Sequence, residues 1–196
     1  MGNKPLNTDV FDRAAKFAID AHHNTERRGK GFPYIIHAME AAEIVSRMTT
    51  DQELLAAAML HDVLEDTDVT EEELRKAFGD RITELVLGES DQKVPDLSET
   101  ASWVERKKFA IDRLKTESRE AKMVALGDKL SNMRAIARDY EEKGDALWAI
   151  FHAPEPKLHR WHYEGLLDSL SELEGEGPYE EFKQLVHDTF SKAFPE

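Results

Sequence analysis

The sequence predicts an all-α protein that folds as a single domain of roughly eight or nine helices. Apolar residues recur at intervals of three and four along most of the chain, which is the spacing of one helix face. Capping-box patterns precede two of these apolar runs, at Thr50-x-x-Glu53 and Thr70-x-x-Glu73. No segment shows the strict apolar–polar alternation that indicates a half-buried strand.

The breaks between the apolar runs define the expected elements in order. The first helix is expected over residues 7–23, and a loop rich in Gly and Pro follows at residues 24–33. The later helices are expected at residues 36–48, from 50, from 70 to a stop at 78–79, 81–89, 103–114, 119–140, 157–173 and 178–194. Residues 90–102 are expected to form a polar loop.

Charge and composition exclude several classes of protein. The 196 residues include 26 Lys and Arg against 40 Asp and Glu, a formal net charge of −14. Such acidity argues against binding to nucleic-acid polymers or anionic membranes, since both require a basic surface. No apolar run approaches the roughly 20 residues that span a bilayer. Cysteine is absent, so disulfides and thiolate chemistry are excluded, and we expect a cytoplasmic protein.

The most informative segment is the apolar run Leu54–Leu60 with the charged residues that follow it. A helix that is apolar on all sides is expected to be buried. Ionisable side chains at the end of a buried helix are costly unless they are paired or bind a metal. At about 100° per residue, a continuing helix places His61 and Glu65 on one side and Asp62 and Asp66 in a row beside them.

Two further ionisable residues lie in apolar helical segments, His37 at the start of one and Asp128 within another. Each has an ordinary structural explanation when taken singly, as a core histidine or a surface pair. Together with His61 and Asp62 they form a mixed nitrogen and oxygen ligand set, which suits Mn, Fe, Zn or Mg better than Ca. Such a metal would acidify bound water, and acidic neighbours could orient or deprotonate it. The pattern predicts metal-assisted hydrolysis, most naturally of a phosphate ester or anhydride.

These residues resemble the H…HD…D pattern of HD-domain metal-dependent phosphohydrolases. The resemblance is closer to the hydrolase domain of RelA/SpoT-type enzymes and to the stand-alone small alarmone hydrolases. The motifs that carry it are PYIIH at residues 33–37, HDVLEDT at 61–67, FGD at 78–80 and DKLSNMR at 128–134. One departure is Gly127, which stands where the family usually has Ala before the metal-binding Asp.

The resemblance implies an all-helical catalytic core over about residues 10–140, within a single domain of residues 1–196 whose C-terminal helices, at about 157–194, pack on that core. It also implies a divalent metal ion, usually Mn²⁺, with the ligands His37, His61, Asp62 and Asp128. Glu65 and Asp66 would handle the attacking water, and which of them transfers the proton stays open.

The substrate that the resemblance implies is guanosine 3′,5′-bis(diphosphate), which loses its 3′-pyrophosphate by attack of metal-bound water. The residues that match the family's substrate contacts are Arg27, Arg28, Lys30, Lys93 and Asn132. Counting back from Gly31 favours Arg28 over Arg27 as the matching arginine, and both stay open. A small phosphorylated nucleotide would thus be the partner.

Three alternatives stay beside this reading. The chain could be an HD-domain phosphatase that acts on another nucleotide. It could be a nucleotide-sensing module without turnover, although none of the expected ligands or water-handling acids is missing. A purely structural helical bundle would leave the charges inside apolar helices unexplained.

Overall fold

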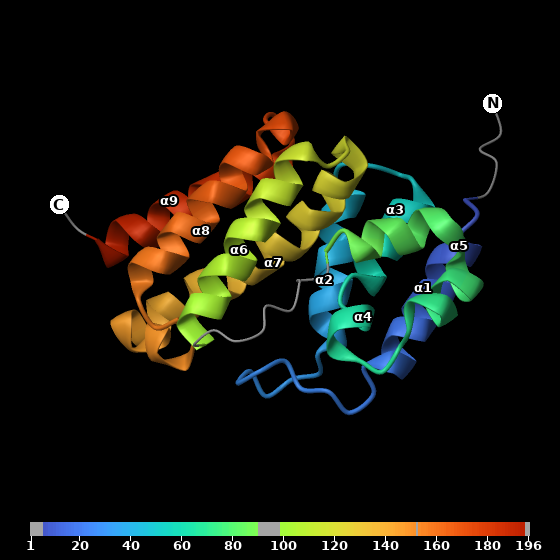
Figure 1. Cartoon of the computed structure of the whole chain (residues 1–196), viewed down its shortest axis with the longest axis horizontal. Coiled ribbons are helices and arrows are strands. Elements are labelled where there is room, and N and C mark those ends of the chain that lie inside the picture. The colour runs from blue at the N-terminus through green and yellow to red at the C-terminus, as the bar shows by residue number, and fades with distance from the viewer. Residues whose placement is uncertain (1–5, 90–98, 152, 195–196) are drawn as a thin grey trace. The chain divides into compact units, whose positions relative to one another are not determined.

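The computed structural model describes residues 6–89, 99–151 and 153–194, and its regular secondary structure is helical (Figure 1). The helices are α1 (Asp9–Ala21), α2 (Ile35–Ser46), α3 (Gln52–Leu60), α4 (Val63–Asp66), α5 (Glu71–Leu87), α6 (Glu99–Thr116), α7 (Arg119–Lys143), η1 (Gly144–Ile150), α8 (Pro156–Ser169), η2 (Ser171–Leu173) and α9 (Gly177–Ala193). Within the described residues, strand-like pairing is limited to an isolated bridge between Glu26 and Pro33. The all-α prediction is confirmed. None of the described helices is long and apolar enough to cross a membrane.

The chain divides into two compact units. The first consists of Met1–Ser90 with Met123–Asp128, and the second consists of Asp91–Lys122 with Lys129–Glu196. A short stretch of α7 therefore belongs to the first unit, while the rest of that helix belongs to the second. The expectation of a single domain, with the C-terminal helices packed on a catalytic core, stays a prediction.

Helix α3 forms the centre of the first unit. All seven residues of the apolar run Leu54–Leu60 are buried, as the sequence predicts. The helix packs against α1, α2 and α5. The predicted cap at Thr50 is wrong, because α3 begins at Gln52 and Asp51 therefore occupies the N-cap position. The Asp51 carboxylate accepts the Glu53 backbone N–H at 2.9 Å.

Helix α5 contains both of the helices that we expected on either side of Gly79. Its capping box is present as predicted, with Thr70 and Glu73 accepting each other's backbone N–H groups. Gly79 interrupts the helical backbone with φ 82° and ψ 178°. A positive φ of this kind is readily adopted only by glycine. The predicted break is therefore confirmed as a kink at Gly79, which joins the two helical segments of α5.

In the second unit, α8 packs against α6 and α9 (Figure 1). Helix α6 begins at Glu99, so the expectation of a loop is wrong for residues 99–102, and residues 90–98 lie outside the described part of the chain. A Cβ on Gly165 of α8 would lie 2.7 Å from the Ile111 side chain of α6. The glycine therefore leaves room for the end of the Ile111 side chain against α8.

Candidate metal centre

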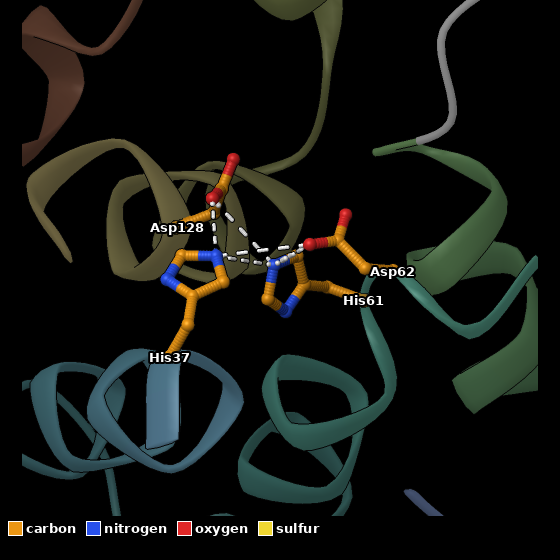
Figure 2. Close-up of side chains that lie close together, drawn as sticks. All are labelled: His37, His61, Asp62 and Asp128. Carbon is orange, nitrogen blue, oxygen red and sulfur yellow. Dashed lines mark hydrogen bonds and ion pairs between the residues drawn. The ribbon is translucent and has the colours of Figure 1, made fainter. Parts of the chain in front are cut away.

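Four ionisable side chains converge within the first unit. They are the predicted ligands His37 from the start of α2, His61 and Asp62 from the end of α3, and Asp128 from α7. Figure 2 shows their rings and carboxylates pointing toward one another. Each residue offers one ligand atom, and these atoms all lie within 4.8 Å of one another. His37, His61 and Asp128 are buried, and Asp62 is half-buried.

The spacing of these atoms fits one shared cation. His61 Nε2 lies 2.8 Å from Asp62 Oδ2 and 3.5 Å from Asp128 Oδ1. His37 Nε2 lies 3.1 Å from the same Asp128 oxygen and 3.7 Å from Asp62 Oδ2. Ligands held at about 2.0–2.2 Å from a transition-metal ion are separated from one another by distances of this order.

The orientation of His61 supports the same interpretation. Its Nδ1–H donates to the Ala58 carbonyl at 2.8 Å, which leaves the Nε2 lone pair facing the cluster. Only 3.2 Å separates that Nε2 atom from His37 Nε2. Two imidazole nitrogens and two carboxylates gathered around one point provide the donor atoms that a divalent cation needs. The residues present therefore fit a metal ion.

A break in the helix allows neighbouring residues to share this point. Helix α3 ends at Leu60, and α4 begins at Val63 after a turn in which Asp62 has φ −102° and ψ 0°. Our expectation of one continuous helix through residues 61–66 is wrong. In a continuous helix, adjacent side chains diverge by about 100°. Because the chain turns after α3, the His61 and Asp62 side chains can converge.

Gly127 places Asp128 next to His37. A Cβ at residue 127 would lie 2.8 Å from the Ala41 carbonyl oxygen and 2.9 Å from the Val45 side chain, both on α2. Helix α7 therefore approaches α2 closely because residue 127 has no side chain. This contact gives the departure from the family's usual alanine a physical reason.

We expect Gly127→Ala to reduce stability by about 1–3 kcal/mol, because overpacking must push α7 away from α2. The same shift should separate Asp128 from His37 and weaken metal binding, measurable by calorimetric titration alongside thermal unfolding. Gly165→Ala is the matched control, since it crowds only a side-chain tip in the second unit. Unchanged metal affinity in Gly127→Ala would contradict this account of the glycine.

Comparison with known families agrees with this geometry. The family model of the HD domain matches residues 14–154 of the sequence. The chain belongs to the HD-domain family. An HD-domain hydrolase implies a divalent metal ion, and each residue of the His and Asp cluster offers one ligand atom.

Several relatives of this HD-domain protein are named for a single hydrolytic reaction. The chain is 37% identical over 134 residues to the guanosine-3′,5′-bis(diphosphate) 3′-pyrophosphohydrolase MESH1 of Danio rerio, covering 67% of this chain and 71% of that protein. It is 38% identical over 128 residues to the Homo sapiens protein of the same name, covering 64% and 68%. The Aquifex aeolicus guanosine-3′,5′-bis(diphosphate) 3′-pyrophosphohydrolase is 33% identical over 144 residues, but the match spans only 20% of its length.

Two solved structures share the fold. One is a metazoan ortholog of SpoT that hydrolyses ppGpp, with a TM-score of 0.72 at 24% identity, covering 95% of this chain and 98% of that one. The other is lmo0812 from Listeria monocytogenes, with a TM-score of 0.69 at 28% identity, covering 79% and 99%. The similarity of fold to the first of these structures covers nearly the whole chain.

The short helix α4 carries the two predicted water-handling acids. The backbone N–H groups of Glu65 and Asp66 donate to the Asp62 carbonyl at 3.2 and 2.9 Å. Both side chains reach solvent. Burial of part of the Asp66 carboxyl and the nearby negative charge of Asp62 raise the pKa of Asp66 above its ordinary value. The HD-domain centre thus has two acids tethered to one of its ligands.

The surroundings of these ligand side chains shift their pKa values in different directions. Burial lowers the pKa of His37 below its ordinary value, which favours the neutral imidazole that binds metals. Burial disfavours charge on His61 and Asp62 as well. Their mutual attraction outweighs it, raising the pKa of His61 and lowering the pKa of Asp62. The Asp62 carboxyl is therefore ionised near neutral pH.

Sequence reasoning missed two aromatic residues at this centre. The Tyr34 hydroxyl donates a hydrogen bond to Asp62 Oδ2. The His22 ring stacks on the Tyr34 ring with centroids 4.6 Å apart. Tyr34 lies within the PYIIH motif, which could have drawn attention to it, whereas His22 sits at the end of α1 with no local signal of its role.

The structure describes four of the five residues that we predict to contact the substrate. Arg27 lies over the Tyr34 ring at 5.3 Å from its centroid, within the loop that precedes α2. Arg28 and Lys30 share this loop, where Gly29 and Gly31 adopt positive φ angles. Asn132 lies on α7 in the second unit, and Lys93 lies outside the described residues. Their contacts with a substrate stay predictions.

Proposed function

We propose that this HD-domain protein is a metal-dependent pyrophosphohydrolase that removes the 3′-pyrophosphate of guanosine 3′,5′-bis(diphosphate). One observation carries the proposal. The complete set of four converging ligands, with two acids one turn away, occurs in a chain 37–38% identical to proteins named for this reaction. The balanced reaction consumes one water, breaks the bond between the 3′ oxygen and phosphorus, and releases GDP and pyrophosphate.

Manganese is the ion that we propose for the centre. His37 and His61 supply imidazole nitrogens, and Asp62 and Asp128 supply carboxylate oxygens, a mixture that suits Mn²⁺. When bound, such a cation lowers the pKa of water and offsets negative charge on a phosphoryl group. Iron, zinc and magnesium accept similar ligands, so metal analysis of the purified protein decides among the four.

We propose different roles for the two acids on α4 toward the attacking water. Asp66 feels the negative charge of Asp62 and lies within reach of the Tyr34 hydroxyl, which favours a role in orienting water at the ligand shell. Glu65 lies on the same turn, exposed to solvent, and can accept a proton and release it to bulk water. We therefore assign proton transfer to Glu65 and orientation to Asp66.

The loop before α2 is proposed to bind the nucleotide. Arg27, Arg28 and Lys30 gather positive charge within ten residues of His37 in this acidic protein. A guanidinium group can hold a phosphate through two hydrogen bonds or stack on a base. Asn132 and Lys93 complete the proposed set of substrate contacts.

The test is turnover of guanosine 3′,5′-bis(diphosphate) by the purified protein with Mn²⁺, within a panel of nucleotides and metals. We expect GDP and pyrophosphate to appear in equal amounts, resolved by anion-exchange chromatography. Release of orthophosphate from another nucleotide would indicate a different HD-domain phosphatase. Binding without turnover under every metal would indicate a sensing module instead.

A further inference from the structure

The hydroxyl of Tyr34 forms a hydrogen bond with one carboxylate oxygen of the candidate metal ligand Asp62. It donates to Asp62 Oδ2, which is also the carboxylate oxygen that lies 2.8 Å from His61 Nε2. The oxygen that faces the other ligands is thus the one that accepts this hydrogen bond. A hydrogen bond to that oxygen restricts rotation of the carboxylate about its bond to Cβ.

Helix α4 itself does not hold the Asp62 side chain in place. Asp62 occupies the N-cap position of α4, but within the described part of the chain its carboxylate accepts no capping hydrogen bond from that helix. Its neighbour His61 is anchored differently, through Nδ1 to the Ala58 carbonyl. Of the four ligands, Asp62 is also the one that is not fully buried. Its orientation therefore depends on a partner outside α4.

Tyr34 is itself held firmly. Its side chain is buried, and its backbone N–H donates to the Thr25 carbonyl at 2.8 Å. The ring stacks on His22 at an interplanar angle of 28° and meets the His37 ring edge-on at 5.6 Å. A rigid donor of this kind can fix the group that it bonds.

His22 interacts with Tyr34 through its ring and not through a hydrogen bond at Nδ1. The side chain is buried, and within the residues that the structure describes the Nδ1 atom has no hydrogen-bond partner. Leaving a buried polar atom unpaired is unfavourable. The His22 ring does stack on the Tyr34 ring. Its place in the fold is thus support for that ring.

We propose that Tyr34 is a positioning residue whose hydroxyl holds the Asp62 carboxylate in the orientation that binds the metal, and that His22 supports the Tyr34 ring by stacking on it. The inference rests on the metal site of the proposed function but not on the identity of the substrate. Hydrogen-bonded partners of metal ligands commonly change metal affinity by about 10- to 100-fold when they are removed.

The first test is Tyr34→Phe, which removes one oxygen atom and keeps the ring. We expect Mn²⁺ affinity, measured by calorimetric titration of the full chain, to fall by about 10- to 100-fold. The d–d absorption of the Co²⁺-loaded protein should also change, because a loosened Asp62 alters the coordination. Tyr179→Phe is the matched control: Tyr179 is equally buried, and its hydroxyl donates to the Leu167 carbonyl in the second unit.

A second pair of variants tests His22. His22→Ala removes the stacked ring and should weaken Mn²⁺ binding, whereas His22→Phe restores a ring and should bind Mn²⁺ as the unaltered protein does. This pair decides the question if Tyr34→Phe fails to fold, as judged by circular dichroism. Unchanged Mn²⁺ affinity and Co²⁺ spectrum in a folded Tyr34→Phe protein would overturn the proposal, as would equal affinities in both His22 variants.

These measurements need no nucleotide, so they separate this inference from the proposed function. If the protein fails to hydrolyse guanosine 3′,5′-bis(diphosphate) while Tyr34→Phe still weakens Mn²⁺ binding, the positioning role stands and the substrate assignment falls. If hydrolysis occurs and Tyr34→Phe leaves the metal site unchanged, the substrate assignment stands and the positioning role falls.

Discussion

His61→Ala is expected to abolish stoichiometric metal binding and to lower turnover by about a thousandfold or more. The imidazole contributes a ligand atom within hydrogen-bonding distance of two others, Asp62 Oδ2 and His37 Nε2. Removing it leaves three ligands around a buried site. A catalytic metal supplies several kcal/mol of stabilisation to charge that develops on a phosphoryl group, and each 1.4 kcal/mol is worth about tenfold in rate. Elemental analysis of the purified protein gives the metal content directly.

His187→Ala is the control for this experiment. His187 lies on α9 in the second unit, and its side chain is 73% exposed. Its loss removes a histidine without touching the cluster, so metal content and turnover should remain at the level of the unaltered protein. Equal metal content in the His61 and His187 variants would show that the metal binds elsewhere.

The buried centre of the first unit could be predicted from sequence because it depends on composition alone. Seven consecutive apolar residues leave no polar face, so Leu54–Leu60 had to be covered on all sides. The ligands followed from the same reasoning, since charged side chains next to a buried helix need partners. His37, His61, Asp62 and Asp128 are the residues that the structure brings together.

Local backbone choices could not be predicted in the same way. Periodicity continued the helix through His61 and Asp62, whereas the chain turns between α3 and α4. The capping pattern at Thr50 was equally valid in sequence, and Asp51 took the position because the helix begins one residue later. In both places several backbone paths satisfy the local preferences, and tertiary contacts select one.

Contacts between segments that are distant in the chain also could not be predicted from the sequence. Gly127 appeared as a departure from a family pattern, and only the position of Ala41 on α2 shows that a methyl group would collide there. Tyr34 lies in a recognisable motif, but its bond to Asp62 joins residues 28 positions apart. Neither helical periodicity nor a motif states which atoms face each other across such a separation.

Glu65→Gln should lower kcat by about 10²- to 10⁴-fold while the metal stays bound, because a missing general base slows proton transfer without removing a ligand. The substitution keeps the length of the side chain and its place on α4. The acidic limb of the pH–rate profile should disappear with it. Asp66→Asn should behave differently, because loss of a negative charge coupled to Asp62 weakens Mn²⁺ binding as well as turnover.

Asp68→Asn provides the comparison for both variants, since Asp68 is an exposed acid two residues beyond α4. It removes the same charge from the same stretch of chain and should change neither metal affinity nor the pH–rate profile. The assignment of roles depends on which variant loses the acidic limb. If Asp66→Asn loses it and Glu65→Gln keeps it, then Asp66 carries the proton, and its contacts with Tyr34 and Asp62 would serve proton transfer rather than orientation.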